Sequence, residues 1–300
     1  MFYSLKDKLR RKWFASQCKG ILKTPPVTLE RNCNLAVLSQ LQHKDVLMFL
    51  LALKSFAREV PIGHVYLLND GSLTESDINL LQAHIPELSF FELKDFQGTS
   101  CPRRGCWERL LAIAELVKKY YVIQLDSDTL TIGAMPELVE CVKQGIAFTI
   151  GTWDNQTIET MEERCTTAKT RTPDASSHVQ LMAEASLDKL KSYKTLHYVR
   201  GCAGFAGFPQ NSFTKDFVEG ISNEMHAAIG SKWSEWGSEQ VMSNIVVANI
   251  ANASVLPHPK YSDCKKMKLP QTVFIHFIGS CRFNTGVYAN LGINIIKQLN

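Results

Sequence analysis

Residues 120–128 read Tyr-Tyr-Val-Ile-Gln-Leu-Asp-Ser-Asp, and this stretch decides how the rest of the chain is interpreted. The run 120–125 is nearly all apolar, which is typical of a parallel strand covered on both faces. Two carboxylates, Asp126 and Asp128, follow it two residues apart. In open α/β sheets, ligands bind beyond the carboxyl ends of the strands. The stretch therefore predicts a central strand with a ligand site at its end.

The pair Asp126 and Asp128 suits a divalent cation. Mg²⁺ and Mn²⁺ prefer hard oxygen ligands and leave positions open for substrate phosphates. Without a cation, two such acids repel each other and need a shared proton if they are buried. The alternative is a solvated turn in which the aspartates only cap backbone groups.

The first half of the chain alternates short apolar runs with amphipathic stretches. This alternation predicts a doubly wound, mostly parallel sheet flanked by helices, while the second half is less regular. The predicted strands are 35–38, 63–68, 88–93 and 120–125, and the predicted helices are 44–59 and 107–119. A further helix is predicted to start at Ser72-Leu73-Thr74-Glu75, where Glu75 occupies the position of the capping-box acid.

Composition sets broader limits. The chain has 300 residues, of which 45% are hydrophobic and 21% charged. It can therefore bury one large core or two small ones, and disorder is excluded as its dominant state. A net charge of +4 is too small to indicate a nucleic-acid partner.

The nine cysteines are scattered, with no CxxC pair. This argues against a secreted disulfide scaffold and a zinc ribbon, and a reducing cytoplasm is the simplest location. No run approaches the roughly 18–20 apolar residues of a membrane span. The N-terminus also lacks the small-residue cleavage site of a signal peptide.

Residues 1–30 differ from the rest. Residues 1–14 read MFYSLKDKLRRKWF, with five cations within residues 6–12 among apolar and aromatic side chains. This composition is found on helices that lie in a membrane interface, although a helix packed on its own domain would explain it as well. We treat residues 1–30 as a basic N-terminal extension with possible peripheral membrane contact.

Three further groups of residues carry chemistry. His276, followed by Gly279 and Arg282, can complete a carboxylate metal site and neutralise a diphosphate. Gln240 and Asn244, four residues apart on a predicted helix that opens with Glu239, suit sugar hydroxyls. Residues 201–208 contain three glycines, which permit close approach of backbone to a ligand.

In their order along the chain, these motifs resemble those of GT-A nucleotide-sugar transferases, most closely the retaining glycogenin-like and lipopolysaccharide-galactosyltransferase-like group. The resemblance covers about residues 34–285. The matching segments are Arg109-Leu110, Asp126-Ser127-Asp128, Cys202-Ala203-Gly204, Glu239-Gln240 with Asn244, and His276 with Gly279 and Arg282.

The chain departs from that pattern at four positions. Cys202 stands where the group has Asn, Glu239 where it has Asp, Arg282 where it has Lys, and Phe283 where Pro is frequent. A cysteine cannot orient a sugar hydroxyl as an amide does.

The resemblance implies one GT-A domain over residues 31–300, with a nucleotide-binding half (31–130) and an acceptor half (131–300). It implies a hexosyltransferase that moves a sugar from a nucleoside diphosphate sugar, with UDP favoured, to a carbohydrate or other hydroxyl acceptor, with retention the favoured outcome. The implied site residues are Asp126, Asp128 and His276 for Mn²⁺ or Mg²⁺, Glu239 and Gln240 for catalysis, and Val37, Ser39, Asp70, Arg109, Gly204 and Arg282 for the donor.

Two other functions remain open. A non-catalytic nucleotide-sugar-binding module can have the same fold. A phosphatase of the haloacid-dehalogenase type also places Asp-x-Asp after a strand, but it has Thr or Val two positions after the second Asp. Leu130 occupies that position here.

Overall fold

The computed structural model describes residues 2–279 and 281–300, with backbone alone for residues 2–5. The chain divides into two compact units. Unit 1 comprises Met1–Phe91, Leu125–Val139 and Pro259–Asn300, and unit 2 comprises Glu92–Gln124 and Glu140–His258. Each unit is built from segments that are distant in the sequence. The domain boundaries at residues 30 and 130 stay predictions.

Unit 1 begins its sheet with β1 (Leu35–Leu41), which pairs in parallel with β2 (His64–Asn69). The strand β3 (Ser89–Glu92) follows β2 in the sheet order. The connecting helices are α2 (Val46–Ala57) and α3 (Glu75–His84). Nearly every residue of α2 is buried, because its sequence is apolar on all sides.

The region of unit 1 around Asp128 and His276 is held by a second, smaller sheet. Its order is β11 (Tyr261–Asp263), β12 (Phe274–His276) and β5 (Thr129–Thr131). The strand β12 is parallel to β11 and antiparallel to β5. In this register His276 is the partner of Thr129, so the pairing brings His276 beside the end of the Asp126–Asp128 segment.

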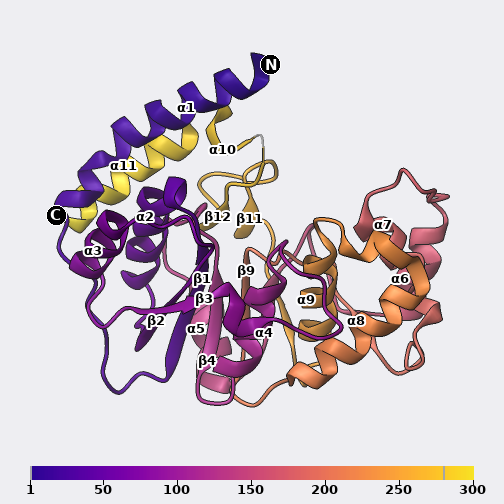
Figure 1. Ribbon diagram of the computed structural model, residues 1–300. Coiled ribbons are helices and arrows are strands. Elements are labelled where there is room, and N and C mark those ends of the chain that lie inside the picture. Colours follow the sequence, from indigo (N-terminus) through magenta and orange to yellow (C-terminus); the bar gives the residue numbers. More distant parts are fainter. Residues whose placement is uncertain (1, 280) are drawn as a thin grey trace. The chain divides into compact units, whose positions relative to one another are not determined.

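The N-terminal helix α1 (Phe2–Cys18) lies along the C-terminal helix α11 (Val287–Leu299), and the short helix α10 (Cys281–Asn284) adjoins both (Figure 1). The inner face of α1 is fixed by Phe14, which is buried against the rings of Phe283 and Tyr288. The opposite face exposes Leu9 and Trp13. The basic segment is therefore a packed helix with one exposed face.

Unit 2 carries a second set of strands in which β6 (Phe148–Ile150) pairs in parallel with β10 (Ser254–Leu256) and antiparallel with β9 (Phe205–Phe208). A short ribbon joins β7 (Glu159–Thr160) and β8 (His197–Tyr198). The helices are α4 (Trp107–Leu116), α6 (Met161–Lys169), α7 (Val179–Glu184), α8 (Lys215–Ile229) and α9 (Ser238–Ala248).

Two elements extend across a boundary between the units. The buried strand β4 (Tyr121–Leu125) leads directly into Asp126, and α5 (Pro136–Gln144) follows β5. All five side chains of β4 are buried, as its apolar sequence predicts for an inner strand.

The predicted fold class, α/β with a mostly parallel sheet and flanking helices, is confirmed. The start of α3 differs in detail from the prediction. Thr74 caps this helix, and its capping-box partner is Asp77 rather than Glu75. The reason is that Thr74, not Ser72, is the last extended residue before the helix, so the third helical position falls on Asp77.

The cysteines show one bond that their spacing does not indicate. Cys264, just after β11, forms a disulfide with Cys281 at the start of α10, and their Cα atoms are 6.1 Å apart. The structure assigns no disulfide to the other seven cysteines. None of the helices in residues 2–279 and 281–300 has both the length and the apolar composition that crossing a membrane demands.

Candidate functional site

Asp126, Asp128 and His276 form a cluster in unit 1, where one possible ligand atom from each lies within 4.8 Å of the others. The His276 Nε2 atom is 3.2 Å from Asp128 Oδ1 and 3.7 Å from Asp126 Oδ2. The proximity expected from the sequence is thus present, although 148 residues separate His276 from Asp128. We call these three residues the triad.

The triad lies mostly below the surface. Asp128 and His276 are each 6% exposed, whereas Asp126 is half-buried. Asp128 is anchored by its backbone, because its carbonyl accepts a hydrogen bond from the amide of Phe277, at 2.8 Å. The backbone between β4 and β5 thus holds one side of the cluster, and the end of β12 holds the other.

Arg282 joins the triad from α10. Its Nη2 donates to Asp128 Oδ2, and its Nε donates to the Phe277 carbonyl at 2.9 Å. Burial alone would raise the pKa of Asp128, but the His276 imidazole and the Arg282 guanidinium hold this pKa below its ordinary value. Asp128 is therefore a carboxylate at neutral pH, as a metal ligand must be.

The donor set fits a hard divalent cation. Two carboxylates and one imidazole converge, and an oxygen-rich set of this kind suits a divalent cation such as Mn²⁺ or Mg²⁺. No other such group of three or more acidic, histidine or cysteine side chains is found in the described part of the chain.

The three predicted nucleoside contacts are in the same unit. Val37 is fully buried in β1, opposite Val65. Ser39 is also fully buried, and its hydroxyl has no hydrogen-bond partner among the described residues. Asp70 follows β2, where its Oδ1 accepts from the Ser72 amide and hydroxyl. Their contact with a nucleoside stays a prediction.

Unit 2 holds a second buried group of charges. Arg109 on α4 and Glu239 on α9 are each 4% exposed, and Arg109 Nη2 lies 3.4 Å from both carboxylate oxygens of Glu239. Both side chains lie on the inward faces of their helices, α4 and α9. Gln240, the next residue, is half-buried.

A hydrogen-bond chain in unit 2 leads from Glu184 to the predicted donor-sugar segment. Tyr198 donates to Glu184 Oε1 at 3.0 Å, and Asn244 Nδ2 donates to the Tyr198 hydroxyl at 3.2 Å. Asn244 Oδ1 in turn accepts from the amide of Gly201, at 3.2 Å. Burial, reinforced by Glu184, raises the pKa of Tyr198 well above its usual value, so the hydroxyl keeps its proton.

The segment from Gly201 to Gly204 is also fixed by contact with Thr149 on β6. The Cys202 amide donates to Thr149 Oγ1 at 3.2 Å. A Cβ atom on Gly201 would lie 2.3 Å from that same oxygen, so only glycine fits. Gly204, predicted to line the donor sugar, is buried just before β9.

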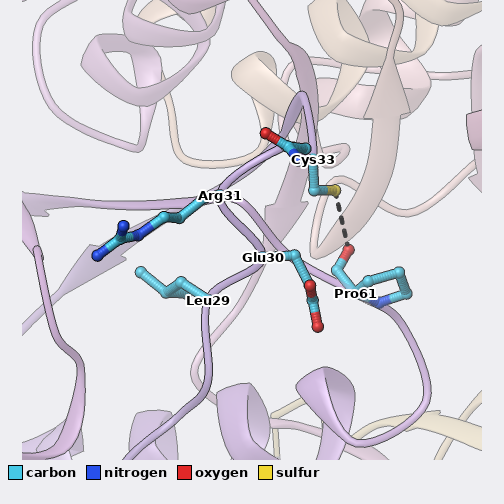
Figure 2. Close-up of a pocket in the computed structure, with 6 residues that line it drawn as sticks. Leu29, Glu30, Arg31, Cys33 and Pro61 are labelled. Carbon is cyan, nitrogen blue, oxygen red and sulfur yellow. Dashed lines mark hydrogen bonds between the residues drawn. The ribbon is translucent and has the colours of Figure 1, made fainter.

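Unit 1 also has a surface hollow that includes none of the triad residues. It is lined by Leu29, Glu30, Arg31, Asn32, Cys33 and Pro61 (Figure 2). The side chain of Cys33 points toward Pro61, with Sγ 3.4 Å from the Pro61 carbonyl. These residues precede β1 and β2, whereas ligands of open α/β sheets bind at the opposite, carboxyl ends. None of the predicted site residues lines it.

Sequence reasoning missed Glu184 and Tyr198, which support Asn244. Each is a single residue of a common type outside any motif, so no local signal was present. It also missed Tyr288, whose buried hydroxyl interacts electrostatically with Asp128 and Arg282. Tyr288 stacks on Phe277, the neighbour of His276, with ring centroids 4.1 Å apart.

No protein-family profile and no curated protein sequence matches this chain. Solved structures do. The bifunctional glycosyltransferase WbbM matches with a TM-score of 0.56 and 14% identity, over 90% of this chain and 51% of WbbM. This chain thus spans about half the length of that protein.

Two other glycosyltransferases match over most of this chain. An active-site mutant of LgtC has a TM-score of 0.53 and 10% identity, covering 88% of this chain and 95% of LgtC. GlyE from Streptococcus pneumoniae has a TM-score of 0.53 and 14% identity, covering 89% of this chain and 63% of GlyE. At such low identity these matches show the fold alone. The fold of this chain is that of the GT-A-type glycosyltransferases.

Proposed function

We propose that this protein is a metal-dependent glycosyltransferase of hexosyltransferase type. It would move a sugar from a nucleoside diphosphate sugar, with UDP favoured, to a carbohydrate or other hydroxyl acceptor. The observation that carries the proposal is the triad of two carboxylates and an imidazole, beyond the end of a buried strand in a GT-A-type fold.

Asp126, Asp128 and His276 would hold the cation, Mn²⁺ or Mg²⁺. When bound, such an ion acts as a Lewis acid that neutralises the leaving diphosphate. Arg282 would add a second positive charge for the diphosphate, since its guanidinium can bind phosphate oxygens in bidentate fashion. The rate would then depend on how well these groups stabilise charge that develops on the leaving group.

The remaining predicted contacts would position the donor. We assign Val37, Ser39 and Asp70 to the nucleoside. The unpartnered buried hydroxyl of Ser39 supports this assignment, because such a group needs a ligand or water to satisfy it. We assign three residues to the sugar end of the donor on the basis of the sequence motifs: Arg109, Gly204 and Gln240.

We further propose retention of the anomeric configuration. Glu239 already accepts hydrogen bonds from Arg109, so proton abstraction would compete with a buried ion pair. A charge-stabilising role is the better fit, and Gln240 would contact the sugar. In folded Glu239→Gln, part of the rate should survive, whereas loss of a general base costs about 10²- to 10⁴-fold. NMR of the product's anomeric proton shows the stereochemistry directly, and an inverted product would refute retention.

The main test is a thermal-shift screen of UDP-, GDP- and dTDP-sugars, each with Mn²⁺ and with chelator. Native-state ligands raise the unfolding temperature by mass action. We expect stabilisation by the UDP-sugar with Mn²⁺ and none with chelator. Equal stabilisation by all three nucleotides in chelator would refute the metal assignment. A product assay with simple sugar acceptors separates transfer from the non-catalytic alternative, which would bind without turnover.

The exposed face of α1 supports a further part of the proposal, peripheral contact with an anionic membrane from the cytoplasm. Leu9 is 59% and Trp13 45% exposed, one helical turn apart, and Lys6, Lys8 and Lys12 are exposed on the same helix. Each basic side chain contributes about 1 kcal/mol near an anionic surface.

The lipid contact has its own test. Replacing both Leu9 and Trp13 by Ser should reduce co-sedimentation with phosphatidylserine vesicles, and added salt should reduce it further. These positions are suitable because they are exposed, whereas removal of residues 1–14 would also remove the buried Phe14. Trp236→Ser is the matched control, since Trp236 is 78% exposed in unit 2. Unchanged sedimentation of the double variant would return α1 to a purely structural role.

A further inference from the structure

Both carboxylate oxygens of Asp128 are engaged by groups of this chain. Oδ1 faces His276 Nε2 at 3.2 Å, and Oδ2 accepts from Arg282 Nη2. Asp128 is 6% exposed, so little water is present to weaken these interactions. The carboxylate that the proposed cation needs is therefore the same one that Arg282 already binds.

A divalent ion and a guanidinium are both cations, and they repel each other strongly at one partly desolvated carboxylate. An ion bound by the triad must therefore either share Asp128 with Arg282 or displace it. Displacement is mechanically simple, because the side chain of Arg282 is 23% exposed and long enough to swing. Displacement breaks the ion pair between Arg282 and Asp128, and this loss is offset only if the guanidinium then binds another anion.

The diphosphate of the donor is such an anion. We infer that Arg282 makes the binding of the metal ion and the diphosphate cooperative, and this inference rests on the proposed function. Arg282 opposes the binding of a cation to Asp128 when no nucleotide is present. The diphosphate removes that opposition by drawing the guanidinium away from Asp128 to its own oxygens. Metal and nucleotide would then bind tightly only together.

The test measures Mn²⁺ binding by electron paramagnetic resonance, with the full chain and in the absence of nucleotide. Arg282→Met removes the charge and keeps most of the apolar stem. It should bind Mn²⁺ more tightly than the wild type by at least about fivefold, the lower end of typical coupling between sites. Arg282→Lys keeps a charge on a shorter side chain and should fall between the two. If Arg282→Met does not fold, the comparison of Arg282→Lys with the wild type still tests the inference.

The same titration is repeated with UDP. In the wild type, UDP should raise Mn²⁺ affinity by a larger factor than in Arg282→Met. Chelation of Mn²⁺ by UDP in solution is identical for all variants, so it cancels in their ratio. Arg58→Met is the matched control, because Arg58 is 22% exposed, lies in the same unit and is paired with Glu59. It should behave as the wild type does.

The outcomes are distinct. If the wild type binds Mn²⁺ with UDP but Arg282→Met binds Mn²⁺ alone no more tightly than the wild type, the inference is wrong and the proposed function stands. If Arg58→Met gains as much Mn²⁺ affinity as Arg282→Met, the effect is one of net charge, and the inference is wrong as well. If no variant binds Mn²⁺ with or without UDP, the proposed metal site and the inference both fail.

Discussion

The triad in unit 1 and the Arg109–Glu239 pair in unit 2 are both buried groups of charges, but they differ in how those charges are matched. Arg109 and Glu239 neutralise each other, one cation against one carboxylate. The triad has two carboxylates, and Arg282 supplies one fixed positive charge beside the imidazole of His276.

The difference separates a charge pair that is complete without a ligand from a group of charges that a bound cation can complete. A buried pair that is complete by itself contributes to folding mainly because removal of one partner leaves an unpaired charge. A group with excess negative charge has a built-in affinity for a cation and gains stability when one binds. The two regions should therefore respond in opposite ways to substitution and to added metal.

The largest effect on stability is expected in unit 2. Glu239→Ala leaves the Arg109 guanidinium buried without its partner, so it should lower the free energy of unfolding by about 3–5 kcal/mol. Denaturant unfolding measures this loss, and Mn²⁺ should not restore it. Adding Arg109→Met should recover part of the stability. A loss below about 1 kcal/mol would mean that the pair is solvated and that the contrast with the triad is false.

A smaller effect is expected for Tyr198→Phe. It removes the donor to Glu184 and the acceptor for Asn244, both buried, at a cost of about 1–3 kcal/mol. The matched control is Tyr193→Phe, which changes a half-buried side chain and should stay within about 0.5 kcal/mol of the wild type. If Tyr198→Phe behaves like this control, the hydrogen-bond chain does not support the Gly201 segment.

The smallest effect on stability is expected for Asp128→Asn. It removes the ion pair with Arg282, but the guanidinium is partly exposed and can turn toward solvent, and the repulsion with Asp126 is relieved at the same time. The metal-free protein should therefore lose no more than about 1 kcal/mol. Its stabilisation by Mn²⁺ with UDP should disappear, which thermal-shift measurements at several Mn²⁺ concentrations reveal. A mutant that is still stabilised as strongly as the wild type would remove Asp128 from the metal site.

The two carboxylates of the triad could be predicted because their signal is local, and His276 could be added because the order of the motifs resembles that of a known family. Asp126 and Asp128 follow an apolar strand, and the order of the motifs placed His276 with them. The partner of Arg282 could not be predicted in this way, since its contact with Asp128 depends on how α10 turns after β12. A sequence pattern suggested a phosphate ligand for Arg282 but said nothing of a carboxylate.

Long-range side-chain pairing explains the other gaps. Tyr198 and Asn244 are separated by 46 residues, and the disulfide partners Cys264 and Cys281 by 17. Neither spacing belongs to a known motif, and each pair meets only through the packing of the elements that carry its members. The helix expected at residues 239–244 is present, whereas the pairing of Glu239 with Arg109 depends on the packing of α4 and α9.

The central claim is that the triad binds the cation that serves the nucleotide diphosphate. The most direct test is an anomalous difference map from crystals grown with Mn²⁺ and UDP. We expect one manganese peak within about 2.5 Å of an oxygen of Asp126, an oxygen of Asp128 and Nε2 of His276, with the diphosphate on the same ion. Bound UDP with no manganese peak at these three residues would contradict it.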